Sequence, residues 1–163
     1  MAASVQLPPD LLAMMANGMS AIVGSHDASL RPSIMRAMGS DVSPDGSRVT
    51  VFLARSQSRQ LLQDIASTGH LSVVFSAPVS HRTVQLKARS ATQRAAAEED
   101  RPVLARYLAA MELELEGAGY PRMLAGVMLA CRLEDLVAVS FTPEQAFDQT
   151  PGPRAGSALG GSR

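Results

Sequence analysis

The chain has 163 residues, 46% of them apolar and 18% charged, a size and composition that fit one globular domain. Fifteen basic and fifteen acidic side chains give a formal net charge of zero, whereas nucleic-acid-binding proteins usually carry a basic excess, so no nucleic acid is expected as a partner. No apolar run approaches the roughly 18 residues of a membrane span and no secretion signal is evident, so we expect a cytoplasmic protein that does not contact a membrane.

The first part of the chain predicts a short helix followed by three strands. The segment LPPDLLAMMANG predicts a helix that Asp10 caps and Gly18 ends. Turn-rich segments separate three candidate strands, at 19–25, 33–38 and 48–54. The segment 39–47 is expected to be a loop, because its Pro-Asp-Gly sequence fits a tight turn. Since these connections are too short for helical crossovers, the strands should pair antiparallel.

The second part of the chain alternates helices and strands. Apolar residues recur at helical spacing in SRQLLQDIASTG, and strands are expected at 71–76 and 83–90, the latter with one polar face. A long helix should begin at Asp100 with Pro102 in its first turn. Its apolar stripe consists of Val103, Leu104, Tyr107, Leu108, Met111 and Leu115. Segment 127–141 is expected to supply one long or two short strands.

These elements predict the fold class. About six antiparallel strands with two or three interposed helices make a mainly β, α+β domain, a small barrel with peripheral helices. A doubly wound sheet does not fit the short connections. We assign residues 1–150 to this single domain, and we expect the tail at 151–163, which is rich in Gly, Pro and Ser, to be flexible.

The stretch VFLARSQSRQLLQDIA changes from a strand to a helix, and its junction is chemically informative. Ser58 occupies the position of a helix N-cap, and Arg59 and Gln60 lie in the first turn. Exposed backbone N–H groups, the helix dipole and a guanidinium together suit a phosphate. The alternative is that Ser58 only caps a surface helix and that Arg59 is solvated.

The order of the motifs resembles the FMN-binding split barrel of the pyridoxamine 5′-phosphate oxidase family. A strand with RPSIMR, a hairpin, VTVFLA, SQSRQLLQDIASTGHLSVVF and RTVQLKA follow one another in that order. The resemblance implies a six-stranded antiparallel split β-barrel and an FMN cofactor. The cofactor-binding residues that it implies are Arg31, Ser33, Met35, Arg36, Leu53, Ala54, Ser58, Arg59, Gln60 and Thr83, with Gln85 as the less favoured alternative to Thr83.

Two departures from the family pattern affect the expected function. Gln60 stands where the family motif has a Lys, which removes one positive charge from the phosphate site. The Arg-x-His and Trp with which pyridoxamine phosphate oxidases hold their substrate have no counterpart, since the chain contains no Trp. Oxidation of a B6 vitamer is therefore not expected.

The histidines and the cysteine do not indicate a metal site. His26, His70 and His81 show no paired spacing, so no metal is expected. His26 and His81 should lie in loops, where either could reach a flavin or a substrate. Cys131 lies among apolar neighbours and is expected to be a buried, inert thiol.

Two functions from different classes follow from the sequence. The first is an FMN-dependent oxidoreductase acting on an unknown small molecule, in which the cofactor supplies the redox chemistry and no catalytic side chain can be assigned. The alternative is a non-catalytic barrel that binds another flat cofactor, a deazaflavin or haem, or that serves as a dimeric structural protein. The resemblance also implies a homodimer with the cofactor site at the subunit interface.

Overall fold

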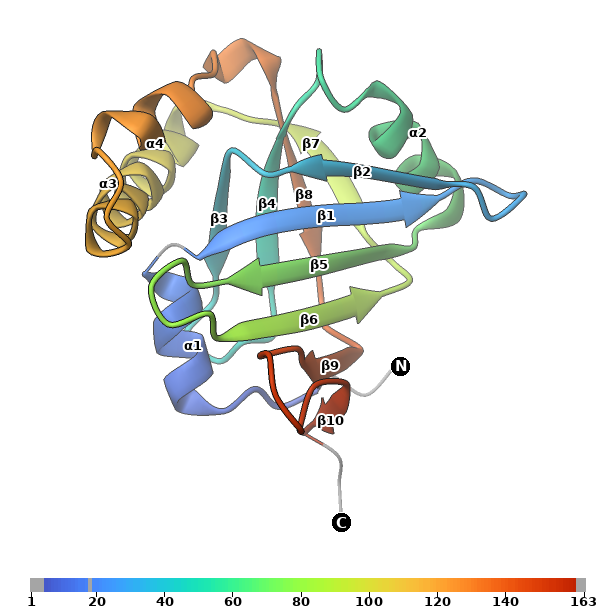
Figure 1. Ribbon diagram of the computed structural model, residues 1–163. Coiled ribbons are helices and arrows are strands. Elements are labelled where there is room, and N and C mark those ends of the chain that lie inside the picture. Colours follow the sequence, from blue (N-terminus) through green and yellow to red (C-terminus); the bar gives the residue numbers. More distant parts are fainter. Residues whose placement is uncertain (1–4, 18, 161–163) are drawn as a thin grey trace.

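The structure, a computed structural model, describes residues 5–17 and 19–160, which form two antiparallel sheets with helices around them (Figure 1). The larger sheet has the order β10-β9-β6-β5-β1-β2 and consists of β1 (Ser20–His26), β2 (Pro32–Arg36), β5 (Leu71–Ser76), β6 (Thr83–Ala88), β9 (Gln145–Asp148) and β10 (Ser157–Leu159). The smaller sheet has the order β3-β4-β8-β7 and consists of β3 (Gly39–Val42), β4 (Val49–Ala54), β7 (Thr92–Ala95) and β8 (Leu136–Phe141).

Helices and 3₁₀ turns connect these strands. The α-helices are α1 (Pro9–Ala16), α2 (Arg59–Thr68), α3 (Arg101–Gly117) and α4 (Met123–Met128), and the 3₁₀ turns are η1 (Glu98–Asp100) and η2 (Leu133–Asp135). In Figure 1, α3 and α4 lie together at one side of the sheets, and α2 lies at the opposite side. None of the helices that the structure describes combines the length and apolar character that crossing a bilayer requires.

The expected antiparallel pairing is confirmed, but a closed six-stranded barrel is not what the strands form. They divide between two sheets that do not close into one. The expected loop at 39–47 contains β3, and β7, β9 and β10 were not anticipated. These four strands have only three or four residues each, too few to show an apolar alternation, and all of β7 is exposed. β10 lies within the segment that was expected to be flexible, and it pairs with β9.

The main core lies between the inner faces of the two sheets. β1, β5 and β6 alternate strictly between buried and half-exposed or exposed residues, as the sequence predicts for β6. Val23, Val73 and Leu86 are completely buried in this core. Polar residues therefore accumulate on the outer face of the larger sheet.

A second core lies between the smaller sheet and the helical pair α3–α4. Tyr107, Met111 and Leu115 of the predicted stripe are buried in it, and Val103, Leu104 and Leu108 are half-buried at its edge. β4 contributes to both cores, since Val51 and Leu53 face the main core whereas Phe52 and Ala54 face the second. Burial on both faces explains why β4 reads as a continuous apolar run.

Three local predictions need correction. Asp10 does not cap α1, because Pro8 is the N-cap residue and the Asp10 carboxylate pairs instead with Arg82 at 2.6 Å. The helix ends at Ala16, and Gly18 lies outside the described residues. Segment 127–141 is not all strand, since its first residues complete α4 and only its last six form β8.

The prediction for Cys131 also needs correction, because this residue is exposed and not buried. Partial burial of the thiol, together with the nearby carboxylate of Asp135, still raises its pKa. The thiol form is therefore favoured, as expected for an unreactive cysteine.

Asp100 is the N-cap residue of α3, as predicted, but its side chain makes no capping hydrogen bond to that helix. The Asp100 carboxylate accepts two hydrogen bonds from the Arg94 guanidinium, both 2.7 Å, and one from the amide of Ala97 at 2.9 Å. The bonds from Arg94 hold the pKa of Asp100 below its usual range. The carboxylate thus ties β7 to the start of α3.

Tyr107 gives a test of the second core. Its side chain is buried and its hydroxyl donates to the carbonyl of Met19 at 2.9 Å, and burial raises its pKa to about 12. Because the folded pKa exceeds the unfolded value of about 10, this group stabilises the fold fully below pH 10 and loses its contribution as the pH rises toward 12.

We therefore predict that the free energy of unfolding of the parent falls by about 1 kcal/mol more than that of Tyr107→Phe between pH 9 and pH 11. Urea unfolding at each pH measures both values. Tyr120→Phe is the matched control, because Tyr120 is 56% exposed and should behave as the parent does. Equal pH dependence of the parent and Tyr107→Phe would contradict the burial of this phenol.

Candidate functional site

The junction between β4 and α2 is fixed by backbone bonds and by one carboxylate. After Ala54, the amides of Gln57 and Ser58 donate to the carbonyls of Ala54 and Arg55. Asp135 of η2 accepts hydrogen bonds from the amide and the hydroxyl of Ser56, which lower the pKa of this carboxyl. The turn is therefore held rigidly where the helix begins.

Ser58 occupies the N-cap position of α2, as predicted, but its hydroxyl makes no capping bond. The side chain is 2% exposed, and within residues 5–17 and 19–160 its Oγ has no hydrogen-bond partner. A buried hydroxyl without a partner costs free energy. The start of α2 therefore contains a buried hydroxyl whose hydrogen-bonding capacity is not used by the described residues.

Gln60 points toward β2 and is engaged by a buried carboxylate. Its Nε2 donates to Asp64 Oδ1 at 2.8 Å, and the hydroxyl of Ser33 donates to Asp64 Oδ2 at 2.6 Å. Asp64 is only 3% exposed. Ser33 therefore ties β2 to α2 through Asp64, while Gln60 bonds the same carboxylate from within the helix. The negative charge of Asp64 lies on the side of α2 that faces β2.

Arg59 lies on the other side of α2. It lines a hollow of about 400 Å³ between α2 and the strands β7 and β8. We call this hollow the arginine hollow; its lining residues are Arg55, Arg59, Leu62, Gln63, Gln93, Arg94, Ala95 and Val137. Arg94 is paired with Asp100, whereas Arg55 and Arg59 are exposed and form no ion pair with any described residue. The hollow therefore has two guanidinium groups available to an anion.

The predicted residues on β2 and β4 are distributed over different surroundings. Leu53 and Ala54 are buried in the cores, and the carbonyl of Ala54 already accepts from the amide of Gln57. Met35 is half-buried and packs against the main core. The side chain of Arg36 donates to the hydroxyl of Ser20 at 2.7 Å. Arg31 is exposed in the turn before β2, and its amide donates to the carboxylate of Asp27.

Thr83 lies far from the start of α2. Its pairing register places it beside Ser76, which in turn pairs with Ser20 at the beginning of β1. Ser33, which contacts α2 through Asp64, pairs with Ser25 five residues further along β1. At about 3.3 Å per residue, these two ends of β1 are roughly 17 Å apart. The structure thus does not bring Thr83 together with Arg59 and Ser58.

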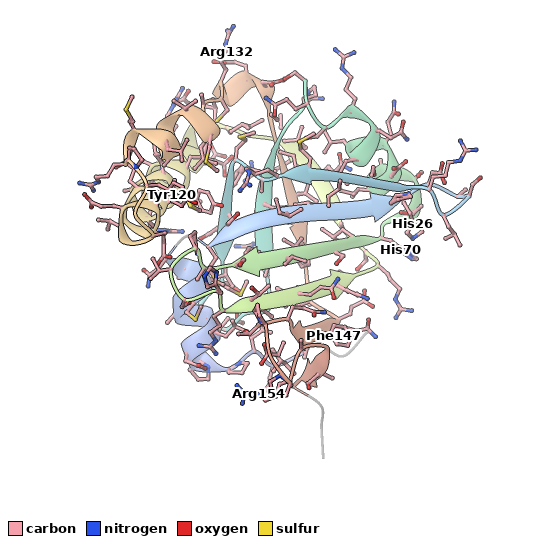
Figure 2. The ribbon with its side chains drawn as sticks, in the orientation of Figure 1. His26, His70, Tyr120, Arg132, Phe147 and Arg154 are labelled. Atoms are coloured by element: carbon pink, nitrogen blue, oxygen red, sulfur yellow. The ribbon has the colours of Figure 1, made fainter. Side chains whose placement is uncertain are left out.

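A larger hollow, of about 920 Å³, lies over β1, β2, β5 and β6, and no sequence pattern predicts it. We call it the sheet pocket; its polar wall includes His26, His70, Lys87, Arg89 and Glu144. Figure 2 shows His26 and His70 next to each other at the end of β1 and the start of β5. His26 Nε2 lies 3.2 Å from His70 Nδ1, and His26 Nδ1 lies 2.9 Å from the carbonyl of Asp27.

This histidine pair follows from strand pairing that no local pattern reveals. β1 and β5 are antiparallel neighbours with Gly24 opposite Ser72, which places the residues that follow and precede them side by side. His26 and His70 are 44 residues apart in the sequence, so their proximity could be predicted only by assuming that their two strands pair. No group of three His, Cys, Asp or Glu side chains within the described part of the chain is placed to hold a metal ion.

Comparison with solved structures identifies the fold. A candidate pyridoxamine 5′-phosphate oxidase from Lactobacillus delbrueckii superposes with a TM-score of 0.55 at 15% identity, over 87% of this chain and 93% of that one. HupZ from Group A Streptococcus gives 0.56 at 14% identity, over 92% and 100%. The fold is that of the pyridoxamine 5′-phosphate oxidase-like proteins.

A third neighbour with this fold is a pyridoxamine 5′-phosphate oxidase-related, FMN-binding protein from Nostoc punctiforme, with a TM-score of 0.51 at 11% identity over 91% of this chain and 87% of that one. No protein-family model matches the sequence, and no curated protein matches it. At such low identities the shared feature is the fold, and the function has to be argued from the residues of this chain.

The shared carboxylate gives a stability test of the site. We predict that Ser33→Ala lowers the free energy of unfolding by about 1–3 kcal/mol, because it leaves one oxygen of the buried Asp64 carboxylate without its donor. Ser90→Ala is the control, since Ser90 is exposed and should stay within about 0.5 kcal/mol of the parent. Urea unfolding measures both variants, and an equal effect would show that Ser33 does not support Asp64.

Proposed function

We propose that this protein binds FMN with the phosphate in the arginine hollow, and that it is an FMN-dependent oxidoreductase acting on a small molecule. The observation that carries the proposal is the pair of exposed guanidinium groups, Arg55 and Arg59, which line this hollow at the start of α2 and form no ion pair with any described residue. A phosphate there would accept bonds from one or both arginines, and the N-terminal end of α2 would favour its negative charge.

The side of α2 on which the phosphate binds is decided by charge. The buried carboxylate of Asp64 repels an anion on the side facing β2, where Gln60 and Ser33 are already engaged. On the opposite side no acidic residue lines the hollow. Arg55 therefore supplies the positive charge that Gln60, in place of a Lys, does not.

The remaining parts of the cofactor site follow from the position of β4. Leu53 and Ala54 end β4 immediately before the turn through Arg55, so the flat ring of the flavin would lie beside this end of the strand. Bound FMN supplies the capacity to accept and donate a hydride. The chain supplies orientation and exclusion of water, which agrees with the lack of an evident catalytic constellation in the sequence. The FMN-binding neighbour from Nostoc punctiforme is consistent with this function.

A haem-binding module without flavin chemistry is a second candidate, and the sheet pocket favours it. Both nitrogens of His26 and Nδ1 of His70 have hydrogen-bond partners, which leaves Nε2 of His70 as the nitrogen that would bind a haem iron. Titration with haemin, followed by the Soret band, distinguishes this candidate from the first, because flavin binding requires no histidine.

Two neighbouring residues in the first turn of α2 provide a matched pair of variants that tests the phosphate proposal. Arg59→Ala should weaken FMN about tenfold or more while changing riboflavin little, since a charge-assisted bond contributes about 1.5–3 kcal/mol and riboflavin lacks the phosphate. Gln60→Ala should leave the ratio of the two affinities unchanged, because Gln60 faces Asp64. Flavin fluorescence titration measures each Kd. Equal losses for FMN and riboflavin in Arg59→Ala, or no flavin binding by the parent, would exclude the proposal.

We also propose that the protein is a homodimer with the cofactor site next to the interface. Four of the large exposed apolar side chains, Leu113, Tyr120, Met123 and Val127, belong to α3, α4 and the turn between them. Met123 and Val127 are 75% and 70% exposed and lie one helical turn apart on α4. The buried face of α4 packs in the same cluster as Ala54, so a copy covering the exposed face would be separated from the end of β4 by the thickness of one helix, about 10 Å.

The dimer proposal is tested on α4. Light scattering at micromolar concentration should give the mass of a dimer for the parent and of a monomer for the double variant Met123→Glu, Val127→Glu, because two carboxylates cannot be buried in an apolar interface without a partner. Ala105→Glu, on the exposed side of α3, is the control and should remain dimeric. A parent that is monomeric, or a double variant that stays dimeric, would be inconsistent with this interface.

A further inference from the structure

We propose that the sheet pocket is a binding site for a planar aromatic molecule that donates a hydrogen bond from a phenolic O–H or ring N–H to Nε2 of His70. This site is separate from the arginine hollow and does not depend on flavin binding. Three features support the inference. The floor of the pocket is a glycine, Gly24, and Nε2 of His70 is free to accept a hydrogen bond. The third feature is Lys87, a positive side chain in the wall that has no ion-pair partner among the described residues.

Gly24 forms the floor of the sheet pocket. It lies in the middle of β1, between Ile34 of β2 and Ser72 of β5. A Cβ added at Gly24 would lie 3.7 Å from the carbonyl of Ser33 and 4.0 Å from that of Ser72, which are ordinary contacts. Gly24 also does not have a positive φ. The backbone therefore does not require glycine here, and the consequence of glycine is open space.

The walls of the sheet pocket suit a flat ring. On one side, Ile34 is 68% exposed on the outer face of the sheet, next to Pro32. On the other side, the ammonium of Lys87 lies 5.2 Å from the centre of the Phe147 ring. A volume of about 920 Å³ is in the range of sites for small organic molecules. An apolar side formed by Pro32 and Ile34 next to an empty floor favours a ring over a flexible polar ligand.

The hydrogen bonds of the histidine pair decide which nitrogen is available. The carbonyl of Asp27 can only accept, so Nδ1 of His26 carries the proton. In neutral His26, Nε2 then has no proton and accepts from Nδ1–H of His70. Neutral His70 is left with an unprotonated Nε2. Among the described residues no partner for this nitrogen is present, so it is an acceptor for a ligand donor.

Charges around the pair leave one positive group for the ligand. Arg89 and Glu144 pair with each other, through the amide at 2.8 Å and the guanidinium at 2.9 Å. These bonds hold the pKa of Glu144 below its usual range, so its carboxylate is ionised and occupied. The Asp27 carboxylate accepts from two backbone amides of the β1–β2 turn. Lys87 remains, and it would favour an aromatic ligand with an anionic substituent.

The probe for this site is 4-hydroxybenzoate, with benzoate as the matched compound that lacks the donor. Isothermal calorimetry on the full chain should show 4-hydroxybenzoate binding about fivefold or more tighter than benzoate, the factor expected for one hydrogen bond. His70→Phe should abolish this preference. His81→Asn is the control, because His81 is exposed in the β5–β6 turn with a φ of 58° that Asn tolerates.

Filling the floor tests the location independently. Gly24→Val should abolish binding of both compounds, while the melting temperature does not fall, since a β-branched residue suits the middle of a strand. Gly24→Ala should bind with intermediate affinity. Binding of 4-hydroxybenzoate that Gly24→Val does not affect would overturn the proposal.

The tautomers give a readout that needs no ligand. Nitrogen NMR at a pH where both rings are neutral should show His26 and His70 as Nδ1–H tautomers, with His70 shifting when 4-hydroxybenzoate is added. An Nε2–H tautomer at His70, no binding of the probe at millimolar concentration, or a change of oligomeric state in Gly24→Val would each overturn the proposal; the last would show that a second chain occupies this surface.

Discussion

The buried carboxylate of Asp64 is the constraint on which the site geometry depends. It accepts from Ser33 on β2 and from Gln60 within its own helix, so it fixes both the distance and the rotation of α2 relative to the larger sheet. Ser33 and Gln60 are both neutral, so each oxygen of the Asp64 carboxylate accepts a hydrogen bond, but neither donor neutralises its negative charge. Because the rotation is fixed, Arg59 must face the opposite side, toward β7.

The position of α2 along the smaller sheet has a different origin. β4 is buried on both faces, in the main core through Val51 and Leu53 and in the second core through Phe52 and Ala54. A strand enclosed in this way cannot slide, because a shift of one residue would exchange the two sets of side chains. The end of β4, and with it the turn through Arg55, therefore lies at a fixed depth beside Asp135.

The sequence predicts the elements whose signals are local. The continuous apolar run of β4, the helical spacing of α2 and the alternation of β6 each reflect burial that the chain itself records. The short strands β3 and β7 and the helix α4 escape prediction because their places depend on neighbours distant in sequence. The same limit applies to the site. Ser58 was located correctly at the helix start, but neither the bond between Gln60 and Asp64 nor the pair of His26 and His70 has a local signature.

Net charge is a poor guide to what such a protein binds. Fifteen acidic and fifteen basic groups cancel over the whole chain, which argues against a polyanionic partner but not against a small anion. Screening limits the reach of exposed charges to about 10 Å at 0.1 M salt, so a ligand responds to the few groups beside it. Arg94 is neutralised by Asp100 and Arg89 by Glu144, whereas Arg55, Arg59 and Lys87 form no ion pair within the described part of the chain. A chain with no net charge therefore still presents positive groups without an ion-pair partner in both hollows, Arg55 and Arg59 at the start of α2 and Lys87 on the outer face of the larger sheet.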